Sequence, residues 1–328
     1  MEIIHCNGIV FRAKDELFVD ASGIRGREAL ITHAHSDHAR LSSSNTYYMT
    51  PQTRALLGAN AGRQNLMEVP FGKAFLVGEF ECRFHPSGHI LGSAQLEVHN
   101  GVHAVLTSDF KLQKSILFEG AQILPGEILV IETTFGIPEY SFPSREQVYE
   151  DMIRWVLANI SGGKFTVLGG YSTGKAQELT KIVNEFLGET PLVYKKIFEQ
   201  NRVYEQQGVK LGNYLLLDHN LADANILILT PHLIDDHMLS ALEHQLGRKV
   251  EAAIATGWGW RSKYKSFPLS DHADFNSLLQ YVKESSPKLV LTTHGFEEEF
   301  ARAVQRKLGI SARPLSRQGQ KTIMEFSG

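Results

Sequence analysis

The sequence has few cysteines, no long apolar run and no excess of basic residues. Its two cysteines, Cys6 and Cys82, cannot build a disulfide framework and suit a reducing compartment. No segment reaches the roughly 18 consecutive apolar residues of a membrane span. The first residues, Met-Glu-Ile-Ile-His-Cys-Asn, lack the basic-then-apolar order of a signal peptide. We therefore expect a cytoplasmic protein that does not bind membranes.

The charge balance excludes a globally basic nucleic-acid binder. The formal net charge is −3, so any phosphate binding must depend on local cations. Hydrophobic residues make up 43% of the chain and charged residues 21%, which is ordinary for a globular protein. With 328 residues and no internal repeat or flexible linker, the chain is long enough for two domains or for one domain with a large insertion.

The first third of the chain favours short strands separated by turn residues. A short helix is predicted over residues 51–57, with Thr50 as its N-cap. Several strands before any long helix predict a sandwich of sheets. The predicted strands cover residues 8–11, 17–20, 29–32, 74–77, 80–85, 94–98 and 102–107.

The pattern changes near residue 136. Residues 137–143 are a helix-poor connector, and Ser144-Arg-Glu-Gln147 then forms a capping-box pattern before an amphipathic helix. Strands and helices alternate from there, which predicts an α/β arrangement with a parallel sheet. After Ser270 we expect helix, strand, helix and a short final strand. The expected layout is residues 1–136 and 269–328 in one domain, with residues 137–268 inserted between them.

Histidine and aspartate are concentrated in one stretch, His33-Ala-His35-Ser-Asp37-His38, directly after an apolar run. Two histidines two residues apart can converge on one cation, and the Asp-His pair that follows can begin a second site. The alternative is a solvated histidine-rich turn. Three later residues follow turns or strand ends and have ordinary alternatives when taken singly, but together with the cluster they complete a ligand set for two cations: His89, Asp109 and His294.

These residues resemble the metallo-β-lactamase fold, an αββα sandwich with metals at its strand ends. Three further segments, Glu132-Thr-Thr-Phe-Gly136, Ser270-Asp-His-Ala-Asp274 and Thr293-His-Gly295, resemble motifs A, B and C of the β-CASP nucleases. The chain is similar to the DNA ligase-associated (mRNA 3′-end processing factor-like) exonuclease group in Ile31-Thr-His-Ala-His-Ser-Asp-His-Ala-Arg40, His89-Ile-Leu-Gly-Ser-Ala-Gln95 and Gly174-Lys-Ala-Gln177. Residues 186–250 match least. The implied fold is α/β, an αββα sandwich with an inserted α/β cap.

The resemblance implies a role for each matched residue. His33, His35 and His89 would hold one divalent ion, and Asp37, His38 and His294 a second, with Asp109 bridging them. The ions would be zinc or manganese. Asp20 would orient ligands, with a surface-turn aspartate as its alternative. Asp37, Glu132 and His272 are expected to serve catalysis. We expect Glu132 to hold His272 for protonation of the leaving oxygen, the alternative being a third metal-bound or merely structural histidine.

Substrate contacts are expected at two places. Ser172, Thr173 and Lys175 precede a predicted helix whose N-terminus could bind phosphate, with an ordinary helix cap as the alternative. Trp260 and Arg261 pair an aromatic ring with a cation, as base-stacking sites do, with core packing as the alternative.

The expected function is a metal-dependent exonuclease on single-stranded DNA. An RNA-processing nuclease is the alternative, because a histidine at motif C resembles the RNA-processing members. A small-molecule metallo-hydrolase and an inactive nucleic-acid-binding subunit are weaker alternatives, the first because such enzymes lack motifs A to C. DNA-repair or RNA-processing proteins would be its partners. The sequence predicts no oligomeric state.

Overall fold

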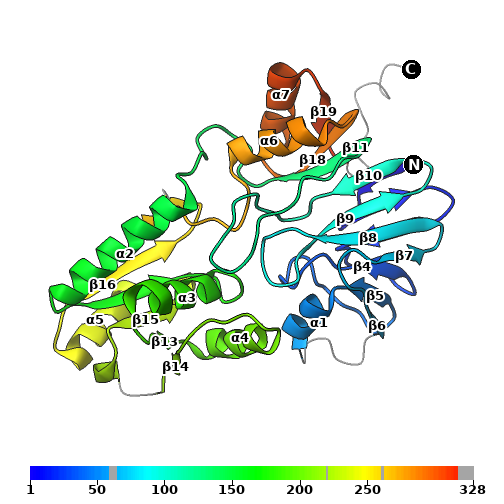
Figure 1. Cartoon of the computed structure of the whole chain (residues 1–328). Helices are drawn as coiled ribbons and strands as arrows, with labels where there is room; N and C mark the ends of the chain where they lie inside the picture. Colours follow the sequence, from blue (N-terminus) through cyan, green and yellow to red (C-terminus); the bar gives the residue numbers. More distant parts are fainter. Residues whose placement is uncertain (59–64, 219–220, 260–261, 317–328) are drawn as a thin grey trace. The chain divides into compact units, whose positions relative to one another are not determined.

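The computed structural model describes residues 1–58, 65–218, 221–259 and 262–316, and it divides into two compact units (Figure 1). The first unit contains residues 1–112, 121–140 and 273–328, and the second contains residues 113–120 and 141–272. The second unit is thus largely inserted into the sequence of the first. The boundaries expected from the sequence lie a few residues before 140/141 and 272/273, and residues 113–120 were not expected in the second unit.

The first sheet of the first unit has six strands. Strands β1 to β3 pair antiparallel, and β3 to β6 pair parallel. The strands, in spatial order, are β1 (Glu2–His5), β2 (Ile9–Arg12), β3 (Glu16–Val19), β4 (Glu28–Leu30), β5 (Thr46–Met49) and β6 (Asn65–Glu68).

The second sheet of this unit has seven strands. Strands β7 to β10 form an antiparallel meander, whereas β10, β11, β18 and β19 run parallel to one another. In spatial order they are β19 (Ser311–Pro314), β18 (Leu289–Gly295), β11 (Ile128–Thr133), β10 (His103–Leu106), β9 (Ala94–His99), β8 (Phe80–Pro86) and β7 (Ala74–Val77).

Alternation of side chains along the strands produces the layers. One apolar core joins residues of both sheets, such as Phe11 and Leu17 with Phe84 and Leu96. A second core packs the other face of the seven-stranded sheet against α6 (Phe275–Ser285) and α7 (Glu297–Leu308). A third includes Leu57 of α1 (Pro51–Leu57) and the outer face of the six-stranded sheet. The unit is therefore the αββα sandwich that was predicted.

The second unit is an α/β fold around a six-stranded sheet in which all pairs are parallel, as predicted. Apolar clusters cover both faces of that sheet. Its strands, in spatial order, are β14 (Leu215–Leu216), β13 (Leu192–Val193), β15 (Ile226–Leu229), β12 (Phe165–Gly169), β16 (Val250–Ala255) and β17 (Lys265–Phe267). Its helices are α2 (Arg145–Ser161), α3 (Lys175–Leu187), α4 (Lys195–Gln206) and α5 (Asp236–Leu246), with 3-10 turns at Leu221–Asp223 and Pro231–Leu233.

Local signals located several elements well. The helix α1 spans the predicted residues, and the hydroxyl of Thr50 caps it by accepting from Thr53 N at 3.1 Å. Ser144 caps α2 by accepting from Gln147 N. Strands β1, β5, β6 and β11 of the first unit were missed. The first three are short and of mixed polarity, which gives a weak alternation signal, and β11 is buried along most of its length and so shows no alternation. Among the described residues, no helix has the length and apolar character needed to cross a membrane.

Candidate dinuclear metal centre

The predicted ligands come from segments that follow strands of both sheets in the first unit. Because β10, β11 and β18 are parallel, their carboxyl ends lie at one edge, where Asp109, Glu132 and His294 occur. The loop after β4 reaches the same edge. Its Thr32 carbonyl accepts from Ala94 N at 2.9 Å, and its Thr32 hydroxyl bonds the Ser108 hydroxyl at 2.7 Å.

Asp20 organises the loop that carries the histidine cluster. Its carboxylate accepts from the backbone amide of Thr32 at 2.8 Å and from the Thr32 hydroxyl at 2.6 Å. It also holds Nδ1 of His38 at 2.8 Å. With Nδ1 engaged, the free Nε2 of His38 is directed toward Asp109, 3.6 Å from its Oδ2. A carboxylate that fixes the tautomer and orientation of a histidine is the usual outer partner of a metal ligand.

The turn between β8 and β9 carries His89. Gly92 has φ +75°, and a Cβ there would lie 2.5 Å from the backbone nitrogen of Thr53, so only glycine fits. The Ser93 hydroxyl closes the turn by accepting from Ile90 N at 3.0 Å and donating to Ile90 O at 2.8 Å. The absent side chain of Gly92 therefore lets this turn approach α1 closely.

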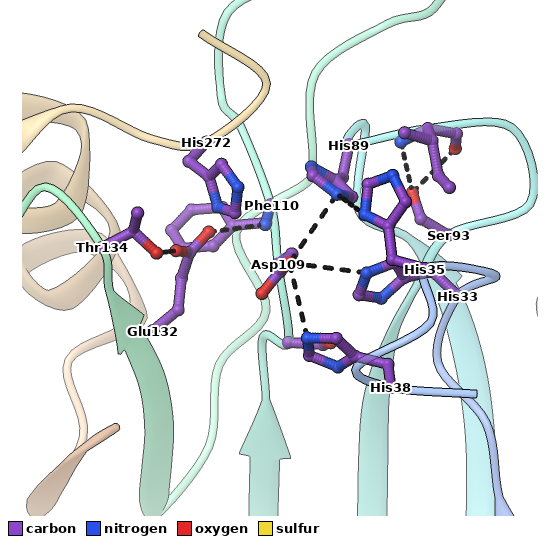
Figure 2. A network of polar contacts seen from close by, with 12 residues as sticks. His33, His35, His38, His89, Ser93, Asp109, Phe110, Glu132, Thr134 and His272 are labelled. Atoms are coloured by element: carbon purple, nitrogen blue, oxygen red, sulfur yellow. Dashed lines mark hydrogen bonds and ion pairs between the residues drawn. The ribbon is translucent and has the colours of Figure 1, made fainter. Parts of the chain in front are cut away.

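Four side chains converge on the carboxylate of Asp109 or on one another (Figure 2). Oδ2 of Asp109 lies 3.4 Å from Nε2 of His33 and 3.7 Å from Nε2 of His89. Nε2 of His89 lies 3.1 Å from Nδ1 of His35. His33 is fully buried, and its Nε2 has no hydrogen-bond partner. A buried nitrogen lone pair that faces a carboxylate without bonding it fits a metal ligand.

The donor set fits divalent ions. One potential ligand atom from each of His33, His35, His89 and Asp109 lies within 4.8 Å of the others, and the same holds for Asp20, His33 and His38. Neutral imidazoles and a carboxylate are the ligands that zinc takes in proteins, and manganese accepts the same types. His33, His35, His89 and Asp109 would hold one ion, and His38 is directed at the place of a second.

Asp37 and His294 lie beside His38 but outside these two tight groups. The Oδ2 of Asp37 is 3.8 Å from Nε2 of His38, and its side chain is 67% exposed. The ring of His294 stacks on that of His38 with centroids 5.5 Å apart. Both line a cavity of about 330 Å³ together with Asp109, Glu132 and Arg40. Their roles as ligands of the second ion stay a prediction.

Opposite pKa shifts distinguish the two histidines nearest Asp109. Burial lowers the pKa of His33 well below its usual value, so this imidazole is neutral and has a lone pair to give. Burial also opposes protonation of His38, but the carboxylates of Asp109, Asp20 and Asp37 outweigh it and raise its pKa to about 10. Without an ion, His38 therefore carries the positive charge that balances these carboxylates, and a bound ion would take its place.

Four residues of the cavity wall have left-handed backbones. Asn7, Asp20, Ser108 and His294 have φ of 52°, 50°, 48° and 56°. Such conformations cost on the order of 1–3 kcal/mol each in non-glycine residues and concentrate at functional sites. His294 occupies a bulge, where Glu132 pairs with Thr293 and Thr133 with Gly295. A bulge re-aims the side chain of the extra residue. Nothing in the sequence signalled Asn7.

Glu132 is buried and fixed in place. Its carboxylate accepts from Phe110 N at 2.9 Å and from the hydroxyl of Thr134 (Figure 2). His272 is the last residue of the second unit, and the amide of the next residue, Ala273, donates to Phe110 O at 2.7 Å. The pairing of Glu132 with His272 stays a prediction.

The predicted substrate contacts belong to the second unit. Ser172 and Thr173 are half-buried before α3, and their contact with phosphate stays a prediction. Lys175 is 2% exposed, and its ammonium lies 2.9 Å from Asp271, so the structure places it in a buried ion pair instead of at a surface. Trp260 and Arg261 lie outside the described residues.

Comparisons with known proteins agree with this geometry. Residues 261–313 match the family described as "Zn-dependent metallo-hydrolase RNA specificity domain". A "Probable DNA ligase" of Opitutus terrae is 33% identical over 87% of this chain and 28% of its own length. "Transcription termination factor FttA" of Methanocaldococcus jannaschii is 23% identical over 84% of the chain and 60% of its own length. The chain thus spans less than two thirds of each relative.

A solved structure shows the same fold. A protein of unknown function from Enterococcus faecalis V583 superposes with a TM-score of 0.68 over 97% of this chain and 98% of its own, at 13% identity. At that identity the likeness concerns the fold alone. The αββα sandwich, the buried His/Asp cluster and the matched relatives together support the metallo-β-lactamase fold and the β-CASP family that the sequence resembles.

Proposed function

We propose that this protein is a metal-dependent phosphodiesterase that degrades single-stranded nucleic acid, acting as an exonuclease on DNA in the cytoplasm. The observation that supports this most is the convergence of His33, His38 and His89 on one carboxylate of Asp109, at the edge of a cavity. Hydrolysis of a phosphodiester needs a nucleophile, neutralisation of phosphate charge and a proton for the leaving oxygen.

Two divalent ions held by this ligand set would supply charge neutralisation and an acidified water. The chain's own residues have separate tasks. Asp20 keeps His38 in one tautomer and orientation. Arg40 is the one arginine or lysine among the cavity-lining residues that the structure describes, and it would bind a phosphate oxygen. Asp37, an exposed carboxylate on the same wall, would accept a proton or position water.

His272 would protonate the leaving oxygen, with Glu132 as its positioning partner. The fixed carboxylate of Glu132 supports this role, since a carboxylate held in place can orient a neighbouring imidazole. His272→Ala should lose most activity on ordinary phosphodiesters and little on substrates with an activated leaving group, which departs without a proton. Equal losses on both substrates would contradict the role of proton donor.

RNA is the second candidate substrate. The matched family is described by RNA specificity, and one of the relatives is a transcription termination factor by name. The histidine at position 294, in the segment that resembles motif C, supports the same reading.

The deciding experiment uses single-stranded DNA and RNA, each labelled at the 5′ or 3′ end, with zinc or manganese added separately. We expect a ladder of products from DNA, its polarity read from the label. Asp109→Asn should abolish it, whereas Asp15→Asn, an exposed aspartate of the same unit, should not. Cleavage of RNA alone would indicate the RNA-processing nuclease. Hydrolysis of small esters, with no cleavage of DNA or RNA, would indicate a small-molecule hydrolase. Metal binding with no hydrolysis at all would indicate an inactive binding subunit.

A further inference from the structure

A second group of histidines surrounds a carboxylate on the seven-stranded sheet, away from the dinuclear centre. Glu97 and His99 lie two residues apart on β9 and therefore project from the same face. His103 is directly opposite His99 on β10, and His85 lies on β8 two residues from the partner of Glu97. Leu96 and Val98 point to the opposite face, into the core between the sheets. The four residues therefore share the outer face of the sheet.

The group lies at the end of its strands remote from the dinuclear centre. His99 ends β9 and His103 begins β10, so both flank the hairpin turn that joins these strands. Asp109 and His89, by contrast, lie beyond the other ends of β10 and β9. The two groups share no residue, and a metal bound at one would not replace a metal bound at the other.

The nitrogens of the group face one carboxylate at distances typical of neighbouring metal ligands. Nε2 of His103 lies 3.0 Å and Nε2 of His99 3.4 Å from Oε1 of Glu97. The two imidazoles stack with centroids 4.0 Å apart, and both Nε2 atoms approach the same carboxylate oxygen. Ligands at about 2.0–2.2 Å from a tetrahedral zinc ion are separated from each other by roughly this distance.

The Nε2 atom of His103 is the best indication that this group binds an ion. Nε2 of His103 is shielded from solvent and makes no hydrogen bond, although Oε1 of Glu97 is only 3.0 Å away. Close approach without hydrogen-bond geometry is expected of two atoms that share an ion. His85 engages the other carboxylate oxygen, Oε2, at 3.0 Å and so fixes the orientation of Glu97.

We propose that Glu97, His99 and His103 form a third metal site, which binds a zinc-like divalent transition ion, with His85 as the positioning residue of the carboxylate. One ligand atom from each of the three lies within 4.8 Å of the others, and a solvent molecule would complete four-coordination. The bound ion would link β9 to β10 across their hairpin and stabilise this end of the sheet. The site does not depend on the proposed nuclease activity.

The protonation of the group agrees with this assignment. Burial and the nearby His99 lower the pKa of His103, which favours the neutral imidazole that a metal needs. Burial opposes ionisation of Glu97, but hydrogen bonds from His85 and His99 outweigh it and lower its pKa. The neighbouring cation on this face is Arg83, which pairs across from Glu97 on β8 and would balance the carboxylate if no metal bound.

The test is the zinc content of the full-length protein after equilibration with zinc and removal of loosely bound metal. We expect the double variant His99→Gln/His103→Gln to retain one zinc ion per chain fewer than the wild type. His244→Gln, which removes an exposed histidine of the second unit, should retain the wild-type content. Because only the difference is read, the result does not depend on how many ions the dinuclear centre holds.

A second measurement guards against a folding defect. Glu97→Gln keeps the shape of the side chain and should also lose one zinc ion, with the circular dichroism spectrum of the wild type. Zinc should raise the melting temperature of the wild type more than that of either variant. Equal zinc content and equal melting shifts in the wild type and the variants would overturn the proposal, and would leave the group as a hydrogen-bonded surface cluster.

Discussion

The orientation of a ligand side chain in the metal centre depends on the residues that hydrogen-bond it as well as on the ligand's own position. His38 is aimed by Asp20, and Asp20 adopts a left-handed backbone with φ 50° to reach both His38 and Thr32. Asparagine and aspartate adopt this conformation more readily than other non-glycine residues. An aspartate-to-asparagine change at position 20 therefore alters charge and hydrogen bonding without adding backbone strain.

We predict that Asp20→Asn lowers metal affinity by about 10–100-fold, the usual effect of losing the outer partner of a metal-binding histidine. The neutral amide no longer favours the tautomer of His38 that leaves Nε2 free. Competition with a chromophoric chelator measures the affinity. Asp15→Asn, at an exposed turn, is the matched control and should bind as the wild type does. Unchanged affinity in Asp20→Asn would show that Asp20 does not orient a ligand.

The two cysteines should differ in reactivity. Cys82 is fully buried, and burial raises the pKa of its thiol to about 12, whereas Cys6 is partly exposed. The folded protein binds the thiol proton of Cys82 more tightly than the unfolded chain does. The contribution of Cys82 to the unfolding free energy is therefore intact below the unfolded pKa near 8.5, and it is lost as the pH rises toward 12. At pH 8 a thiol reagent should modify one cysteine in the native chain and two after denaturation. The folded Cys6→Ser variant should not react with the thiol reagent. A reaction in that variant would show that Cys82 is accessible to solvent.

At the scale of elements, the turn after β8 and the helix α1 are built against each other. The hydroxyl of Thr50, the N-cap of α1, donates to Gly92 O at 2.7 Å, and Thr53 donates to the same oxygen at 3.0 Å. The absent side chain of Gly92 makes this approach possible. The position of His89 thus depends on a contact between segments about forty residues apart in sequence.

Gly92→Ala should destabilise the protein more than Gly101→Ala. Both glycines have positive φ, +75° and +66°, so both substitutions add backbone strain of about 1 kcal/mol or more. Only at Gly92 would the new Cβ meet backbone, whereas nothing lies within 4 Å at Gly101. The difference in unfolding free energy should be about 1–3 kcal/mol, the cost of overpacking. Chemical denaturation measures it, and equal losses would refute the close approach.

In the second unit, α2 and α3 are joined by a buried ion pair. Both Arg145 and Glu178 are almost fully buried, 2.6 Å apart, and Tyr149 also donates to Glu178. Arg145→Met leaves this buried carboxylate with only the more distant ammonium of Lys175, 3.7 Å away, and we predict a loss of about 3–5 kcal/mol in unfolding free energy. Arg154→Met, on the exposed face of α2, should cost less than about 1 kcal/mol. Similar losses in urea denaturation would contradict the buried pair.

At the scale of the whole molecule, the predicted metal ligands and the tryptophans belong to different units. All the predicted metal ligands belong to the first unit. The two tryptophans that the structure describes, Trp155 and Trp258, belong to the second, and Trp260 falls within the same stretch of the sequence. Tryptophan fluorescence therefore follows the unfolding of the second unit, whereas circular dichroism follows both.

Removal of metal should destabilise the first unit. At a free metal concentration of 100 times Kd, binding stabilises the folded state by about 2.7 kcal/mol, and a chelator removes this. We predict that a chelator lowers the melting temperature seen by circular dichroism by several degrees and changes the fluorescence transition less. Restoring zinc should restore the original value. A circular dichroism transition unaffected by chelation would contradict metal binding by the folded protein.

Much of the fold could be predicted from local signals. Apolar alternation located β7 to β10, and capping residues located the starts of α1 and α2, because each signal acts within a few residues. The pairing order of the two sheets, and strands as short and mixed in polarity as β5 and β6, depend on contacts distant in sequence. Those contacts leave no local pattern.

The sequence by itself determined the chemistry of this protein: the density of histidine and aspartate after β4, with His89 and Asp109 further on, specifies a metal-binding set because side-chain donors are fixed by residue type. Tertiary structure decided the orientation of these ligand side chains. The bulge at His294 arises from strand pairing, and so does the meeting of His85, Glu97, His99 and His103. Pairing sets which side chains share a face and which strand ends share an edge, and no single segment carries that information.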